Sequence, residues 1–247
     1  MSKFFLASAL CALFFIVTVS AEAKPQTDTL KTSGGDLKIT LLGHGSLMFD
    51  YGGKIIHVDP FGKIADYSKL PKADLILITH DHFDHLDPAA LSKVRTKETP
   101  VVLTEACSKK VEGGLVMKNG DEKTVAGLKI QAVPAYNIVH KRDSGGAYHP
   151  KGRGNGYVIT FGDRRVYVAG DTENIPEMKA LDSIDVAFLP SNLPYTMTPE
   201  MVADAAGAFK PKVMYPYHYK FGKSDLPKLE KLMKDVDGVD TRLLNTN

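Results

Sequence analysis

The sequence predicts a layered α/β fold built as a single domain. Apolar runs of about five residues recur along the chain and are separated by Gly and Asp, a pattern typical of strands bounded by turns. Stretches with helical signals lie between several of these runs, and this alternation favours helices packed on sheets. Without an N-terminal leader about 220 residues remain, which is enough for one sizeable core without disulfide bonds.

Residues 1–23 are expected to be a signal peptide. A short basic start precedes an almost wholly apolar run from Phe4 to Val19, and Ser20–Ala23 supplies the small residues of a signal-peptidase site. The apolar run is shorter than the roughly 20 residues of a membrane span. We therefore expect cleavage after Ala21 or Ala23 and export, to the periplasm, with no stable membrane anchor left after cleavage.

The charge of the chain argues against nucleic acid as a partner. The formal net charge is +2, and removal of residues 1–23 takes away Lys3 and Glu22 together, so the balance does not change. No basic field suited to nucleic acid or an anionic membrane remains. The mature chain keeps one cysteine, Cys107, so no intramolecular disulfide can form. We expect a small-molecule substrate, and the oligomeric state stays open, a homo-oligomer included.

Polar residues 24–36 are expected to form a flexible leader, and the folded domain to span residues 37–247. The first predicted strands are Leu37–Leu42, Ser46–Tyr51, Lys54–Val58 and the continuous apolar run Leu75–Thr79. Gly52 and Gly53 predict a hairpin turn between the second and third of them.

The rest of the domain continues the alternation of strands and helices. Helices are predicted at Pro88–Val94, Glu105–Gly113, Pro199–Phe209 with Thr198 as its cap, and Asp225–Lys234. Further strands are predicted at Val101–Thr104, Lys129–Val133, Gly156–Phe161, Arg164–Ala169, Val186–Pro190 and Val213–Tyr217. The long irregular stretch Tyr136–Gly156 is expected to be a functional loop, because idle loops of that length are uncommon.

A cluster of titratable residues follows the strand that ends at Thr79: His80, Asp81, His82, Asp84 and His85. Residues just beyond such a strand emerge at its carboxyl end, where α/β sheets place their sites. On extended backbone His80 and His82 point to the same side, and two close imidazoles suit zinc. Asp84 and His85 can serve a second, neighbouring ion, whereas Asp81 is expected to face away. A solvated polar loop would explain a lone His-x-His better than it explains the full cluster.

The segment T-H-D-H-F-D-H, Thr79 to His85, resembles the T-H-x-H-x-D-H signature of the metallo-β-lactamase superfamily, and the likeness extends over nearly all of the mature chain. The resemblance implies a four-layered αβ/βα sandwich with one or two metal ions at the edge between its two sheets. Among members of the superfamily, the chain looks closest to small metal-dependent hydrolases. These include ascorbate-6-phosphate lactonase-like proteins and, more distantly, N-acyl-phosphatidylethanolamine phospholipase D.

The resemblance implies two further ligands downstream. The segment V-Y-V-A-G-D-T is similar to the family's G-D-T segment, so Asp171 would bridge both metals. The segment M-Y-P-Y-H-Y ends a strand with His218, which would join Asp84 and His85 on the second metal. Without the resemblance, a turn aspartate and a half-buried structural histidine would explain the same two residues.

The remaining ligand of the first metal is expected in the long loop, where two histidines compete. The pattern V-P-A-Y-N…Y-H-P-K-G-R-G-N-G-Y-V-I is similar to relatives in which A-Y-N precedes H-P-K-G, and it favours His149. The phospholipase-like branch favours a histidine near position 140, so His140 remains the alternative.

Several further residues are expected to support the site. The segment from Leu41 to Phe61 resembles the family's G-H-x-S hairpin followed by a strand ending in D-P-F, so Asp59 would orient a ligand imidazole or a metal-bound water. His44 would line the site mouth as a substrate or proton-transfer residue, with a plain turn role as the alternative, while His57 is expected to be structural. Four residues are expected either to contact the substrate or only to pack or face solvent: Tyr136, Tyr195, Lys151 and Arg153.

The implied mechanism is hydrolysis by a hydroxide shared between two divalent ions. The ions lower the pKa of the water that forms this hydroxide toward roughly 7. The bond attacked would be an ester or lactone, an amide or a phosphodiester. Asp84 and His44 are the candidate catalytic residues, because either can carry a proton to the leaving group. Zinc is the expected metal, and manganese or iron would accept the same ligands.

Three alternatives belong to other classes of protein. Export favours a secreted β-lactamase, but the downstream motifs resemble the general hydrolases more closely. A di-iron oxidoreductase of the same fold would typically carry Glu in place of His82, and often a flavin domain. A non-catalytic metal-binding protein would have no need of two complete ligand sets.

Overall fold

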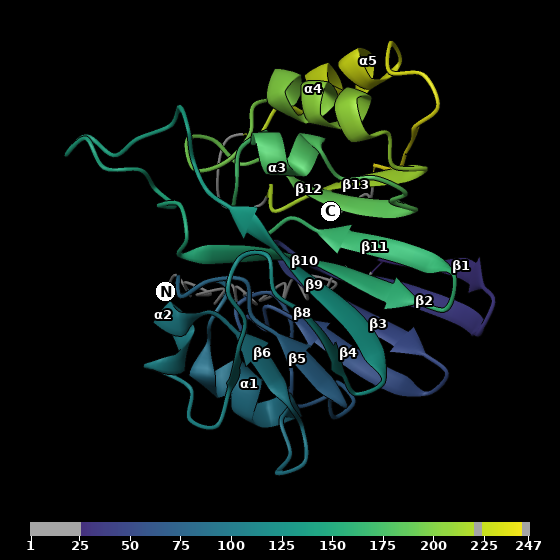
Figure 1. The fold of residues 1–247 in the computed structure, drawn as a ribbon, viewed down its shortest axis with the longest axis vertical. Coiled ribbons are helices and arrows are strands. Elements are labelled where there is room, and N and C mark those ends of the chain that lie inside the picture. The colour runs from purple at the N-terminus through teal and green to yellow at the C-terminus, as the bar shows by residue number, and fades with distance from the viewer. Residues whose placement is uncertain (1–25, 220–223, 244–247) are drawn as a thin grey trace, which may run out of the picture.

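The computed structural model describes residues 26–219 and 224–243, which form two seven-stranded sheets stacked face to face. Helices cover the outer face of each sheet (Figure 1). The predicted signal peptide, residues 1–23, lies outside the described residues. Within the two described ranges, no helix has the length and apolar character needed to cross a membrane.

The first sheet contains the first seven strands in chain order: β1 (Gln26–Thr32), β2 (Gly35–Gly43), β3 (Ser46–Tyr51), β4 (Lys54–Val58), β5 (Leu75–Leu77), β6 (Val101–Leu103) and β7 (Leu115–Val116). The strands β1 to β4 pair antiparallel, and β4 to β7 pair parallel. The parallel part directs the ends of β4 and β5 toward one edge, where the histidine cluster begins.

The second sheet repeats this plan with the other seven strands: β8 (Glu122–Val125), β9 (Leu128–Ala135), β10 (Gly154–Phe161), β11 (Arg164–Val168), β12 (Val186–Pro190), β13 (Val213–Tyr217) and β14 (Asp240–Thr241). The strands β8 to β11 pair antiparallel, and β11 to β14 pair parallel. The two halves of the chain therefore share one topology, although they show no sequence repeat.

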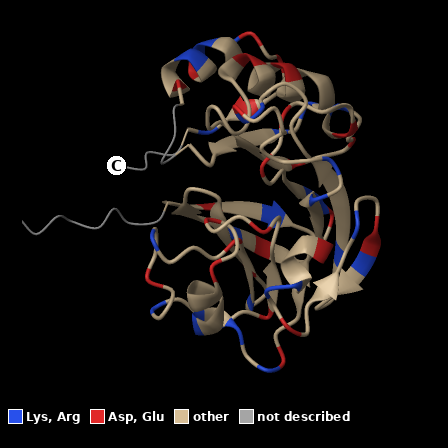
Figure 2. Ribbon diagram, turned by 90° about the vertical axis from the view of Figure 1, so that its left-hand side faces the viewer, with Lys and Arg blue, Asp and Glu red and all other residues tan. Residues whose placement is uncertain are grey.

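Three apolar clusters separate the four layers, which confirms the predicted sandwich. One lies between the sheets and includes Phe49 and Phe188. A second packs α3 (Pro176–Lys179), α4 (Pro199–Phe209) and α5 (Leu226–Met233) on the second sheet. The third packs α1 (Pro88–Val94) and α2 (Glu105–Ser108) on the first sheet. On the side that Figure 2 shows, Lys and Arg are interspersed with Asp and Glu over the helices and loops.

The helix boundaries follow from capping. Asp87 accepts hydrogen bonds from two backbone N–H groups at the start of α1. Thr198 accepts one such hydrogen bond at the start of α4, and Asp225 accepts one at the start of α5. Each of these helices has proline in its first turn, where no N–H is needed. The helix predicted to reach Gly113 stops at Ser108, and the chain then turns before β7.

The prediction of a flexible leader over residues 24–36 was wrong for most of that range. Residues Gln26–Thr32 form β1, the edge strand paired with β2 along its whole length. An edge strand is held by backbone hydrogen bonds and needs few apolar residues, and here only Leu30 packs against the core. The carboxylate of Asp28 also contacts Tyr215 and Arg242 in the other half of the chain.

Candidate metal centre

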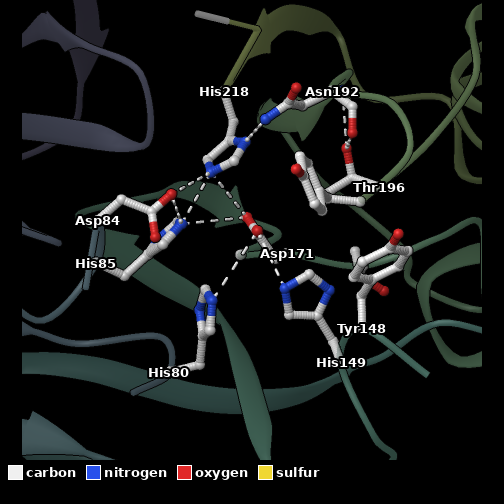
Figure 3. A network of polar contacts seen from close by, with 12 residues as sticks. His80, Asp84, His85, Tyr148, His149, Asp171, Asn192, Thr196 and His218 are labelled. Carbon is white, nitrogen blue, oxygen red and sulfur yellow. Dashed lines mark hydrogen bonds and ion pairs between the residues drawn. The ribbon is translucent and has the colours of Figure 1, made fainter. Parts of the chain in front are cut away.

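The predicted site residues converge at one edge of the sandwich, where strands of both sheets end (Figure 3). His80, His82, Asp84 and His85 follow β5, and His149 lies just before β10. Asp171 follows β11, and His218 directly follows β13. The carboxyl ends of the parallel strands thus bring segments more than a hundred residues apart into one cluster.

Asp171 lies at the centre of the cluster, with one oxygen toward each side (Figure 3). Its Oδ2 is 3.2 Å from His149 Nε2 and 3.9 Å from His80 Nε2. Its Oδ1 is 3.4 Å from His85 Nε2 and 3.3 Å from His218 Nε2. One carboxylate therefore faces two separate sets of ligand atoms.

The first set consists of His80, His82 and His149. Their ring centroids are 4.6 to 5.1 Å apart, and their nitrogen atoms converge. The buried Nε2 atoms of His80 and His149 have no hydrogen-bond partner among the described residues. Burial lowers the pKa of His82 to about 4 and that of His80 well below its ordinary value. The imidazoles of His80 and His82 are therefore neutral at pH 7, the form that binds a metal.

The second set consists of His44, Asp84, His85 and His218. The Nε2 atoms of His85 and His218 are 2.8 Å apart, and Asp84 Oδ2 is 2.9 Å from His44 Nε2 and 3.6 Å from His218 Nε2. Burial opposes the charged form of His85, yet Asp171, Asp59 and Asp84 raise its pKa to about 10. This side of the cluster is rich in negative charge and favours a cation at its centre.

The Nδ1 atoms of four of the candidate ligand histidines contact groups behind them, so each Nε2 faces the cluster. His80 Nδ1 is 3.0 Å from Thr79 Oγ1, and His85 Nδ1 is 2.7 Å from Asp59 Oδ2. The other two contacts are His149 Nδ1 to Asn137 Oδ1 at 2.8 Å and His218 Nδ1 to the amide of Asn192 at 3.2 Å. Such contacts fix the ring orientation of a metal ligand, and an oxygen that accepts a hydrogen bond from Nδ1–H also leaves Nε2 as the metal-binding nitrogen.

Asp59 has the position predicted for it. It is fully buried, and it accepts hydrogen bonds from the backbone N–H of Thr79 at 2.8 Å and from the Thr79 hydroxyl at 2.6 Å. Asp59, His44 and His218 all have positive φ angles, near +50°, which are uncommon outside glycine. Residues held in such conformations concentrate at functional sites.

The structure brings His149 into the cluster and leaves His140 outside it. The backbone N–H of His149 donates to Asn137 Oδ1 at 2.8 Å, and its Nε2 faces Asp171. His140 Nδ1 instead lies 2.7 Å from Glu173 Oε1, and His140 belongs to neither ligand set. Of the two histidines considered from the sequence, only His149 is placed to bind a metal with His80 and His82.

Glu173 is a supporting residue that the sequence interpretation missed. Its carboxylate is fully buried and accepts hydrogen bonds of 2.6–2.7 Å from three consecutive backbone N–H groups, Ile138 to His140. It also accepts from Asn137 Nδ2 at 3.1 Å. Glu173 therefore anchors the residue that orients His149. The available signal was an acidic residue two positions after Asp171, directly behind a buried strand end.

The other sequence-predicted residues lie outside the cluster. His57 is buried and its Nε2 is 3.1 Å from the Pro71 carbonyl oxygen, so it is structural, as predicted. Asp81 also lies apart from the ligand sets. Three expectations of substrate contact are not supported: the Tyr136 hydroxyl donates to Glu177, Lys151 pairs with Glu177, and Arg153 pairs with Asp81.

A cleft of about 680 Å³ borders the cluster. Its lining includes His44, His82, Asp84, His149, Asp171 and His218, so it gives a ligand access to both sets. Tyr195 also lines it, with 40 % of its surface exposed, which keeps the predicted substrate contact possible for this tyrosine.

The residues of the cluster fit divalent metal ions. Imidazole nitrogens and carboxylate oxygens are ligands that zinc, manganese and iron accept. The unpartnered buried nitrogens and the carboxylate with an oxygen toward each set supply the donor atoms. A protein-family model described as the β-lactamase superfamily domain matches residues 38–218. The chain belongs to the metallo-β-lactamase superfamily.

Relatives within this superfamily are named for hydrolase activity. A UPF0173 metal-dependent hydrolase of Thermococcus onnurineus is 35 % identical over 195 residues, which cover 74 % of this chain and 84 % of the relative. The crystal structure of a protein from Parabacteroides distasonis, named as a metal-dependent hydrolase, is 50 % identical with a TM-score of 0.83 and covers 89 % of this chain and 98 % of that one. The metallo hydrolase Igni18 of Ignicoccus hospitalis is 25 % identical with a TM-score of 0.70, covering 85 % and 95 %.

These similarities confirm the predicted superfamily, its small metal-dependent hydrolase branch and the α/β sandwich. The protein is a metal-dependent hydrolase of the metallo-β-lactamase fold.

Proposed function

We propose that this hydrolase uses two divalent metal ions, most simply zinc, to cleave an ester, lactone, amide or phosphodiester bond of a small molecule. His80, His82 and His149 would hold one ion, Asp84, His85 and His218 the other, and Asp171 would bridge them. The observation that carries the proposal is the orientation of Asp171, whose two oxygens face the two sets.

When bound, two such ions would lower the pKa of a water toward roughly 7 and so supply a nucleophile at neutral pH. The chain contributes orientation. Asp59, Thr79, Asn137 and Asn192 fix the ligand imidazoles from behind, so the cluster needs little rearrangement during a catalytic cycle.

Asp84 and His44 are proposed to handle the proton of the leaving group. Asp84 Oδ2 and His44 Nε2 are 2.9 Å apart, and both residues line the cleft. Burial lowers the pKa of His44, and the contact with Asp84 opposes this shift. A proton shared by this pair can reach a departing oxygen or nitrogen on the substrate side.

Covalent catalysis by the cysteine is not part of the proposal. Cys107 is fully buried, and burial raises the pKa of its thiol to about 11. A protonated thiol without access to the cleft is a poor nucleophile.

We also propose that the protein is exported to the periplasm, because residues 1–23 have the pattern of a signal peptide.

The test is hydrolysis by mature protein that has been stripped with a chelator and reloaded with zinc, manganese or iron. The panel contains 4-nitrophenyl acetate, a γ-lactone, nitrocefin and bis(4-nitrophenyl) phosphate. Activity that returns with metal, and that is absent in Asp171→Asn, supports the proposal. Activity that survives full metal removal would contradict it, and nitrocefin as the one good substrate would favour the β-lactamase alternative.

A further inference from the structure

We propose that the cleft selects an organic anion: a substrate with an apolar body and a negatively charged group, which Lys63 and Arg142 bind at the mouth of the cleft. The inference rests on the proposed hydrolase function and deepens it, because it names the substrate class. It follows from the aromatic residues of the cleft, the two cations beside them and the charge balance of the lining.

Two aromatic pairs line the cleft, one from each half of the chain. Phe61 and Phe83 come from the first half, with ring centroids 5.9 Å apart. Tyr148 and Tyr195 come from the second half, with centroids 5.0 Å apart, and Tyr148 lies beside His149 in Figure 3. Phe83 is 70 % exposed, although a phenylalanine is normally buried. Exposed apolar surface in a cleft marks a binding site for an apolar group.

A cationic side chain lies over one ring of each aromatic pair. Lys63 Nζ lies 5.6 Å from the centre of the Phe83 ring. The Arg142 guanidinium lies 5.2 Å from the centre of the Tyr148 ring and donates to the Tyr148 carbonyl oxygen at 3.2 Å. A ring face positions a cation without neutralising it. Among the described residues, neither Lys63 nor Arg142 forms an ion pair with a carboxylate, and both line the cleft.

Each carboxylate that lines the cleft already contacts groups other than Lys63 and Arg142. Asp81 pairs with Arg153 at 2.8 Å and with Lys110 at 3.7 Å, while Asp84 and Asp171 belong to the metal cluster. The two cations therefore remain uncompensated, and bound divalent ions would add further positive charge. A cleft with low-dielectric walls focuses this field and raises the local concentration of anions.

The positions of these groups indicate how the substrate lies. Lys63 and Arg142 are exposed, whereas His85 and Asp171 are buried. The bond to be cleaved would lie over the buried cluster, the apolar body between the two aromatic pairs, and the negative charge at the open end. Lys151 and Arg153, the cations suggested by the sequence, cannot serve in this way because both are paired with acids.

The test compares two esters with one leaving group: neutral 4-nitrophenyl butyrate and mono-4-nitrophenyl glutarate, whose acyl chain ends in a carboxylate. The zinc-loaded wild type is expected to have a higher kcat/KM for the anionic ester, by on the order of tenfold, and added salt should reduce the difference. In the double variant Lys63→Glu/Arg142→Glu the ratio should fall to one or below. Lys97→Glu, which removes an exposed lysine that does not line the cleft, should keep the wild-type ratio.

Equal kcat/KM values for the two esters in the wild type, or an unchanged ratio in the double variant, would overturn the inference. If neither ester is hydrolysed, the proposed ester chemistry fails, and a binding measurement decides the inference separately. Naphthalene-2-sulfonate, an apolar anion that is a weak metal ligand, is titrated into wild type and double variant by calorimetry. Binding to the wild type that the double variant loses supports the anion site; no binding, or equal binding to both proteins, overturns it.

Discussion

The two ligand sets around Asp171 differ in charge more than in geometry. The first set contains three imidazoles, and the pKa of His82 is lowered to about 4 because burial disfavours its charged form. The second set contains Asp84 and has the buried carboxylate of Asp59 behind His85. Burial acts on His85 as well, but there the acids outweigh it and raise the pKa to about 10.

The two proposed ions would therefore be bound for different physical reasons. In the first set burial keeps the imidazoles of His80 and His82 neutral and ready to bind, and the side-chain amide of Asn137 orients His149. Around His85, in the second set, lie the carboxylates of Asp84, Asp171 and Asp59, so a cation near them relieves their mutual repulsion. We expect the second ion to be the more tightly bound, and the variants below test whether the two sets differ in this way.

The largest effect is expected from Asp171→Asn, which removes the charge that both sets share. An amide offers one oxygen and no negative charge, so both ions should be lost or weakened together. Activity should fall by much more than the 10–100-fold typical for loss of an outer-shell partner. Metal titration of the variant checks this; loss of only one ion would show that Asp171 does not bridge.

Next come the residues behind the histidines, which should separate the two sets. Asp59→Asn should weaken the second ion about 10–100-fold, because the strongest acceptor behind His85 is lost. Asn137→Ala should weaken only the first ion, because Asn137 contacts His149. The two affinities are measured by competition with a coloured chelator. Equal losses at both sites in either variant would contradict the separation.

A smaller effect is expected from Gly45→Ala, which disturbs the second set alone. A Cβ at this position would lie 2.8 Å from His85 Cε1 and 3.1 Å from His218 Cδ2. Because both rings are fixed from behind, the variant should lose roughly 1–3 kcal/mol of stability and part of its activity. Gly146→Ala is the matched control, since open space surrounds that position. Thermal unfolding and activity of the two variants provide the comparison.

The smallest effect on activity is expected at His57, which lies outside both sets. Burial lowers its pKa to about 4, so at pH 7 it is neutral in both folded and unfolded chains. As pH falls from 6.5 to 4, His57 takes up a proton in the unfolded chain but stays neutral in the folded chain. The free energy of unfolding therefore falls by about 3 kcal/mol. His57→Gln should flatten this part of the pH–stability curve in metal-free protein. An unchanged curve would assign the acid sensitivity to other groups.

The candidate ligands could be named from the sequence by two routes: His80 and His82 from their place directly after an apolar strand, and Asp171 and His218 from the resemblance to the superfamily's motifs. His80, His82, Asp171 and His218 all come at or near the ends of buried runs, and the topology then brings these ends to one edge. The choice of His149 over His140 needed the structure, since both lie in the same loop. Its deciding contacts, to Asn137 and Asp171, join residues that are distant or unremarkable in sequence.

The supporting network and the edge strand were not predictable for a related reason. An acidic residue two positions after Asp171 is visible in the sequence, but Glu173 acts through backbone N–H groups of a loop about 35 residues earlier in the chain, so no local pattern shows what it contacts. The strand β1 depends on pairing with β2 rather than on its own apolar residues. Lys63 and Arg142 stand out only once the acids that neutralise their neighbours are located in space.

The most direct test of the account is metal content by elemental mass spectrometry on purified mature protein. Wild type is compared with His82→Ala, which alters the first set, and Asp171→Ala, which alters both. The account predicts about two equivalents per chain in the wild type, about one in His82→Ala, and a loss at both positions in Asp171→Ala. A wild type that binds no stoichiometric metal under metal-replete conditions, or binds two ions without Asp171, would contradict the bridged two-ion centre.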